Sequence, residues 1–169
     1  MTATASGKVG GSRRSAARLA AVQALYQIEL SGTPVAKVVD EFLQLRLGRG
    51  PENEIYQDAD GDWFADVVRG CHARQQEIDA LIDGCLDKDR TLPRLEAIQR
   101  ALLRAGTYEL LARPDVPARV VITEYVDVAH AFFAGAEPGF ANGVLDQLAR
   151  RIRTGEIDGA GGGRARPSR

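Results

Sequence analysis

Three arginines near the N-terminus are the residues of this chain best suited to binding an anion. Arg13, Arg14 and Arg18 lie in the segment SRRSAARLAAVQALYQIEL, and residues 1–20 contain no acid. The planar guanidinium of arginine can grip a phosphate with two hydrogen bonds and can stack on a base. A nucleic-acid interface is therefore one interpretation of the cluster. On charge alone, a solvated helix end is the better interpretation.

The sequence contains no recognisable catalytic or metal-binding pattern. It lacks a glycine-rich phosphate loop, an HExxH motif and a GxSxG motif. His72 and His130 are expected at helix surfaces, and Cys71 and Cys85 lie too far apart to pair if one continuous helix carries them both. We therefore expect no catalytic residue, no metal ion and no cofactor, and an enzyme is the least favoured function.

Length and composition are typical of one ordinary globular domain. The chain has 169 residues, of which 44% are hydrophobic and 27% charged, and this balance excludes a wholly disordered or fibrous protein. The longest uncharged stretch, residues 19–28, has about half the length that a membrane helix needs, and the N-terminus lacks the apolar segment of a secretory signal. These features predict a cytoplasmic protein that does not enter a membrane.

The net charge of −1 hides an uneven distribution of charged residues. Residues 40–62 hold seven acids, whereas residues 150–169 hold six arginines against Glu156 and Asp158. Two basic ends suggest an anionic partner, and charged tails that merely keep the protein dissolved explain them equally well.

Hydrophobic periodicity predicts an all-α fold. Apolar residues recur at helical spacing, and no run alternates long enough to suggest a strand. The expected helices are, in order, one ending at Gly32, one from Pro34 to Gly48, one from Asp60 that kinks or divides near Gln75, one opened by Pro93, one between Pro117 and Gly135, and one from Phe140. We predict a compact bundle of six to seven helices over residues 13–153, with flexible tails at 1–12 and 154–169.

Five segments resemble the NusB family of transcription antitermination factors. In chain order they are RRSAARLAAVQALY (13–26), WFADVVRG (63–70), RALLRAGTYEL (100–110), DVPARVVITEYVDVA (115–129) and FANGVLD (140–146). AVQALY near the start together with FANGVLD near the end is specific, whereas either motif alone is weak. The similarity continues to about Ile152.

This resemblance implies a fold of two three-helix sub-bundles and a function in recruitment rather than catalysis. Family members bind boxA-type single-stranded RNA through an arginine-rich first helix. They act as a heterodimer with the ribosomal protein NusE and join the RNA polymerase antitermination complex during rRNA transcription.

The resemblance also assigns two sets of site residues. The RNA-binding set is Arg13, Arg14, Arg18, Gln23 and Phe140. The partner-binding set, which is expected to face NusE, is Tyr26 and Gln99. Local patterns offer alternatives, because periodicity alone assigns Tyr26 to the core, and an aromatic residue at a helix start, such as Phe140, is usually core.

Two departures from the family pattern bear on RNA binding. Ser15 and Ala16 interrupt what is often a denser arginine run, and Gly139 stands where a basic residue frequently precedes the phenylalanine. A second hypothesis therefore stays open: a helical protein-interaction module, as a homodimer or adaptor, whose arginines are only solvated. An RNA-processing enzyme is the third.

Overall fold

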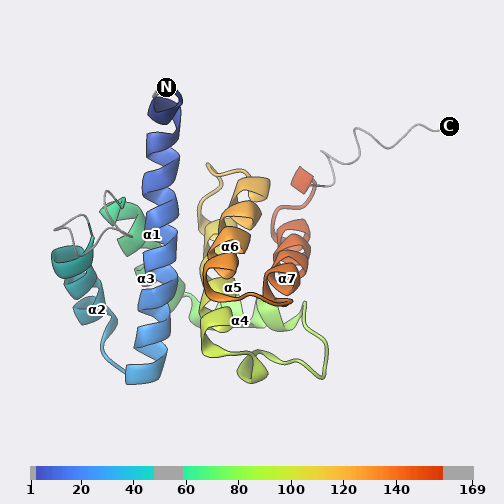
Figure 1. Cartoon of the computed structure of the whole chain (residues 1–169). Coiled ribbons are helices and arrows are strands. Elements are labelled where there is room, and N and C mark those ends of the chain that lie inside the picture. Colours follow the sequence, from blue (N-terminus) through green and yellow to red (C-terminus); the bar gives the residue numbers. More distant parts are fainter. Residues whose placement is uncertain (1–2, 48–58, 158–169) are drawn as a thin grey trace. The chain divides into compact units, whose positions relative to one another are not determined.

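The computed structural model describes residues 3–47 and 59–157, and it describes side chains from Arg13 onward except that of Arg46. Within these ranges the chain is helical and forms no strand, which confirms the all-α prediction. The chain divides into two compact units, Met1–Arg74 and Gln75–Arg169 (Figure 1). None of the described helices combines the length and the apolar character needed to cross a membrane.

The first unit is a three-helix arrangement that packs around small residues of its longest helix. Its elements are α1 (Ala3–Ser31), α2 (Val35–Glu41), the π-helical turn η1 (Phe42–Arg46) and α3 (Gly61–Ala73). The buried face of α1 is rich in alanine, which lets neighbouring helices approach closely: Ala17, Ala20, Ala21 and Ala24 are fully buried. Against this face α3 contributes the apolar side chains of Phe64, Val67 and Val68.

Local signals end α1 and start α3 in the first unit. The end of α1 at Gly32 agrees with the sequence prediction. Gly32 follows α1 with a φ of 72°, a left-handed conformation that glycine adopts without strain, and its N–H donates to the carbonyl of Ile28. Asp60 caps α3, because its Oδ1 accepts a hydrogen bond of 3.0 Å from the backbone N–H of Trp63.

The second unit is built around a central helix, α5, that is buried on several sides. Its α-helices are α4 (Gln75–Asp83), α5 (Ala97–Ala112), α6 (Ala118–Phe132) and α7 (Glu137–Ile152), with a 3-10 turn, η3 (Leu92–Arg94), before α5. Gly106 on α5 faces α7 closely, since a Cβ atom at this position would lie 2.8 Å from Cδ2 of Leu145. Nearby, the Tyr125 hydroxyl of α6 donates a hydrogen bond of 2.6 Å to the buried Glu109 carboxyl of α5.

Some boundaries differ from the sequence prediction. The long helix expected from Asp60 does divide, at Arg74. The last helix begins three residues before Phe140, because Pro138 suits a first helical turn and does not extend the preceding loop. The 3-10 turn that contains Pro93 is separate from α5, which begins only at Ala97.

The expected tails also differ where the structure describes them. Residues 3–12 belong to α1 and contain no proline to interrupt it. After α7, Ile157 is buried, and Oε2 of Glu156 accepts a hydrogen bond of 2.6 Å from the backbone N–H of Ala118. Pro117 precedes α6 and has no side chain that can accept a hydrogen bond from the first N–H groups of this helix. The carboxylate of Glu156 supplies the acceptor instead. Residues 158–169 and the loop at 48–58 lie outside the described residues.

Candidate nucleic-acid interface

The three N-terminal arginines occupy different environments on α1. Arg13 is exposed and Arg14 is half-buried, whereas Arg18 is only 2% exposed. The guanidinium carbon of Arg14 lies 4.0 Å from the centre of the Trp63 ring, and that of Arg18 lies 5.4 Å from it. The resemblance places all three arginines in the RNA-binding set, but the structure leaves Arg13 and Arg14 accessible and buries Arg18 beside an aromatic ring.

Backbone contacts fix this arginine–tryptophan group. The N–H of Asp60 donates a hydrogen bond of 3.0 Å to the carbonyl of Arg13, which ties the start of α3 to α1. Asp60 also caps α3 through the N–H of Trp63. The indole therefore comes from the first turn of a helix that is attached at that point to the arginine-bearing turn of α1. The sequence carries no signal that pairs Trp63 with these arginines, because the residues lie far apart along the chain.

Gln23 and Tyr26 lie further along α1. Gln23 is half-buried, and Tyr26 is 37% exposed. The core assignment that periodicity gives to Tyr26 is therefore wrong. Leu30, one turn later, is 61% exposed, so the end of α1 presents an aromatic and an aliphatic side chain at i and i+4 spacing. Such a pair suits contact with another protein.

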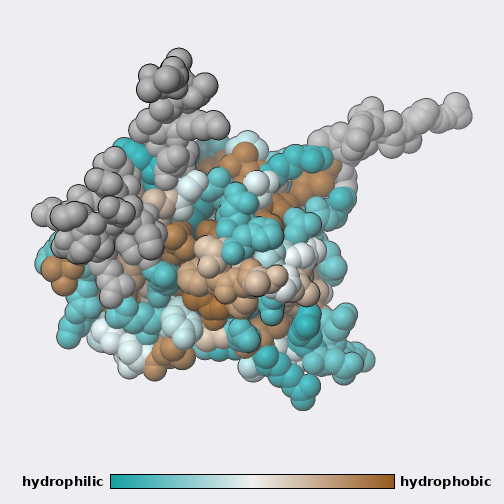
Figure 2. All heavy atoms as spheres, viewed as in Figure 1, coloured by the Kyte–Doolittle hydropathy of each residue, from teal (hydrophilic) through white to brown (hydrophobic). Residues whose placement is uncertain are grey.

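The other two predicted site residues, Gln99 and Phe140, belong to the second unit and line one cavity there. The cavity has a volume of about 210 Å³, and its lining includes the basic side chains of Arg90 and Arg94. One wall comes from the segment between α4 and α5, residues 84–96, where hydrophilic side chains cover the surface (Figure 2).

Gln99 forms a buried wall of this cavity and not an exposed surface. Its side chain is 3% exposed, and its Nε2 donates a hydrogen bond of 3.2 Å to the carbonyl of Glu137. Its Oε1 is buried and has no hydrogen-bond partner within the described residues. An unpaired buried acceptor is unfavourable, and Gln99 is among the residues that line the cavity.

Phe140 is half-buried at the first turn of α7, and a cation already lies on its ring. The guanidinium carbon of Arg90 is 4.5 Å from the ring centre. Aromatic and guanidinium planes both stack on unpaired bases. The ring, the arginines and the amide of Gln99 therefore form a site with the chemistry to hold one base and its phosphate. Sequence reasoning missed Arg90 and Arg94, which lie in a turn without a motif.

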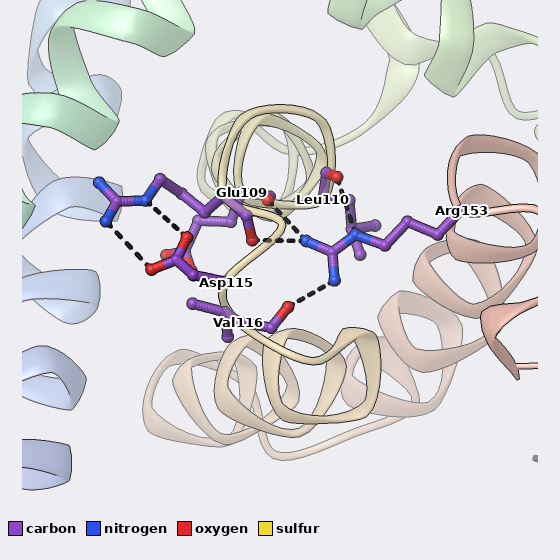
Figure 3. Close-up of polar contacts among 6 residues, drawn as sticks. Glu109, Leu110, Asp115, Val116 and Arg153 are labelled. Atoms are coloured by element: carbon purple, nitrogen blue, oxygen red, sulfur yellow. Dashed lines mark hydrogen bonds and ion pairs between the residues drawn. The ribbon is translucent and has the colours of Figure 1, made fainter.

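Two of the arginines at the end of α7 are engaged by groups of the protein itself. Arg153 points toward the C-terminal end of α5, where its guanidinium donates to the carbonyls of Glu109, Leu110, Arg113 and Val116 (Figure 3). Its side chain is 8% exposed. The neighbouring Arg150 pairs with Asp146 at 2.9 Å. Arg153 therefore has a structural role, because it satisfies carbonyls that the last turn of a helix leaves unpaired.

Other groups that could do chemistry are dispersed. No cluster of histidine, cysteine and acidic residues able to hold a metal ion occurs in the part of the chain that the structure describes. His72 and His130 are exposed on α3 and α6, as predicted, and neither Cys71 nor Cys85 takes part in a disulfide. Burial raises the pKa of the Cys85 thiol, and Arg151 opposes this shift only in part.

Comparison with known proteins decides the family. The NusB family model matches residues 15–150. The chain belongs to the NusB family. A relative named transcription antitermination protein NusB, from Sphingopyxis alaskensis, is 56% identical over 140 residues, which cover 83% of this chain and 94% of the relative.

Solved structures of NusB proteins share the fold. NusB of T. maritima superposes with a TM-score of 0.69 and 30% identity, over 81% of this chain and 90% of the other. A crystal structure described as antitermination factors NusB and NusE in complex with dsRNA gives a TM-score of 0.64 at 24% identity, over 82% and 97% of the two chains. At that identity the second match supports the fold alone.

Proposed function

We propose that this NusB-family chain is an RNA-binding transcription antitermination factor. It binds boxA-type single-stranded RNA together with the ribosomal protein NusE and joins the RNA polymerase antitermination complex during rRNA transcription. The observation that carries the proposal is the family match across residues 15–150, combined with the accessible arginines of α1. A factor that works on the polymerase acts by binding and not by catalysis, and it works in the cytoplasm.

Within this proposal the RNA-binding residues divide by role. Arg13 and Arg14 provide phosphate contacts, because their side chains reach the surface of α1. Phe140 provides a stacking face in the second unit, and we assign Gln99 to the RNA site and not to the NusE-facing set, because it lines the same cavity. Arg18 supports the site from the core and does not bind phosphate.

Tyr26 remains the proposed NusE contact. Its exposure, together with that of Leu30, favours an interface role. The same pair supports the second candidate function, in which the chain is a helical interaction module that pairs with itself or an adaptor and reads no RNA directly.

Native mass measurement separates the two functions. The chain is mixed with a boxA-type RNA, with NusE, and with both, and a scrambled RNA of equal length serves as the control. The proposal predicts a ternary complex of one chain, one NusE and one boxA-type RNA that the scrambled RNA does not form. A homodimer, or a NusE complex without RNA at the same concentrations, would instead support the interaction module.

A further inference from the structure

Trp63 lies between the core of the first unit and its accessible arginines. It is the chain's single tryptophan, and it is 4% exposed. Both Arg14 and Arg18 lie over its ring. A guanidinium is held over an indole by attraction to the electron-rich ring face, and tryptophan gives the strongest such attraction among the aromatic side chains.

We infer that Trp63 is a positioning residue that holds the Arg14 guanidinium ready for an RNA phosphate. Stacking occupies only the face of the guanidinium, so the N–H groups that radiate in its plane stay free to donate. Arg14 is half-buried, so part of the residue is in contact with solvent. The inference rests on the proposed RNA-binding function and adds a residue to it that never touches RNA.

The thermodynamic reason for such a device is preorganisation. A free arginine side chain loses rotamer freedom when it binds, and this loss weakens the complex. On α1 that ordering has already occurred through the ring of Trp63. The indole itself is fixed because Asp60 caps its helix and donates to the carbonyl of Arg13.

Arg18 completes the arrangement on the buried side. Its guanidinium carbon is 5.4 Å from the ring centre, and its side chain is almost wholly inaccessible. It therefore helps to hold the indole in place from within the core. Contact with Trp63 therefore explains why α1 carries an arginine, Arg18, that is too buried to reach a phosphate.

The test is a double-mutant cycle on RNA affinity, with Trp63→Leu, Arg14→Ala and the double variant. Trp63→Leu lowers the affinity for boxA-type RNA by roughly threefold to tenfold, as expected when binding must order one flexible side chain. Arg14→Ala then has a smaller effect in the Trp63→Leu background than in the wild type, because the two residues act through one contact. Trp63→Phe, which keeps an aromatic face, restores most of the affinity.

Phe64→Leu is the matched control. Phe64 is fully buried on the same helix and stacks on Phe42 at 5.3 Å between ring centres. Its loss lowers the thermal stability but leaves the effect of Arg14→Ala on affinity unchanged. Additive effects of Trp63→Leu and Arg14→Ala would overturn the inference.

Arg14→Lys provides a test that leaves the core intact, in case Trp63→Leu does not fold. Lysine keeps the charge but has neither a planar group to stack on Trp63 nor the fork that grips a phosphate with two hydrogen bonds, so we expect a loss of affinity of roughly threefold to tenfold with little change in salt dependence. Affinity equal to that of the wild type would contradict the inference. In RNA-free protein, Arg14→Ala must also change the emission of Trp63, and an unchanged spectrum would exclude the stack.

The outcomes separate this inference from the function on which it rests. If the wild-type chain does not bind boxA-type RNA, the proposed function fails. If the wild type binds and Arg14→Ala weakens binding, but the Trp63→Leu and Arg14→Lys variants behave like the wild type, the function stands and the positioning role of Trp63 is wrong.

Discussion

Nε of Arg153 donates a hydrogen bond of 3.0 Å to the backbone carbonyl of Leu110, which lies on a different helix. This bond is one of several through which a single guanidinium closes the C-terminal end of α5 (Figure 3). The end of the central helix of the second unit is thus capped from the end of α7. Without this side chain, buried carbonyls would lose their donor.

We therefore expect Arg153→Met to destabilise the protein while leaving RNA affinity unchanged. Methionine keeps the aliphatic volume but removes the charged donors, and the loss should be about 3 kcal/mol in the free energy of unfolding. Urea unfolding measures it. Arg150→Gln is the matched control, because the exposed pair of Arg150 with Asp146 should contribute about 0.5 kcal/mol or less. Equal effects of the two substitutions would exclude the capping role.

Tyr125→Phe tests the buried polar pair in the second unit. The change removes the hydroxyl that donates to Glu109, whose side chain is fully buried, and should lower the free energy of unfolding by about 1–3 kcal/mol. Thr123→Ala, at an exposed position on the same helix, should change it by about 0.5 kcal/mol or less. A Tyr125→Phe variant as stable as this control would show that the hydrogen bond contributes nothing.

Tyr26→Ala should weaken NusE binding more than about tenfold, as loss of a central interface tyrosine does. The accompanying loss of stability should stay below about 1 kcal/mol, because the side chain is 37% exposed. Val22→Ala, fully buried one turn earlier, is the opposite control: it should lower stability by about 2 kcal/mol and leave NusE affinity intact in the folded protein. The interface assignment is wrong if Tyr26→Ala behaves like Val22→Ala.

Cys85 should react slowly with iodoacetamide at neutral pH. Burial raises the pKa of its thiol above the ordinary value, so less of the reactive thiolate exists at a given pH than in a free cysteine. The same shift means that this group favours the folded state at low pH and that its contribution is lost as the pH rises through the folded-state pKa. Mass spectrometry of the alkylated protein from neutral to alkaline pH follows the reaction, with urea-unfolded protein as the control. A rate in the folded protein equal to that in urea would contradict the raised pKa.

Local signals predicted much of the fold, and tertiary contacts decided the rest. The buried width of α5 and the break near Gln75 follow from hydrophobic spacing, which depends only on neighbouring residues. The burial of Arg18 could not be predicted in this way, because it depends on an indole 45 positions further along the chain. The role of Arg153 could not be predicted either, because the carbonyls that it binds lie on α5 and just after it, far away in the sequence.

The candidate site was predicted in its residue types more than in its geometry. The family resemblance assigned Gln99 to the partner-facing set, but its buried position depends on the bond of its Nε2 to the start of α7. That its Oε1 is buried without a partner can be recognised only in the folded structure. No sequence motif brings Arg90 onto the ring of Phe140, since the turn that carries it has no periodic pattern.

The salt dependence of RNA affinity tests whether the accessible arginines of α1 bind RNA phosphates. Each phosphate neutralised on a single strand contributes about 0.7 to the slope of log affinity against log salt. Replacing Arg13 and Arg14 together by Ala should therefore reduce the slope by roughly 1.4 for a boxA-type RNA. The control variant Lys37→Ala with Arg119→Ala removes two exposed charges elsewhere and should leave the slope unchanged. If the Arg13 and Arg14 variant keeps both the affinity and the slope of the wild type, these arginines are only a solvated helix face and do not bind RNA phosphates.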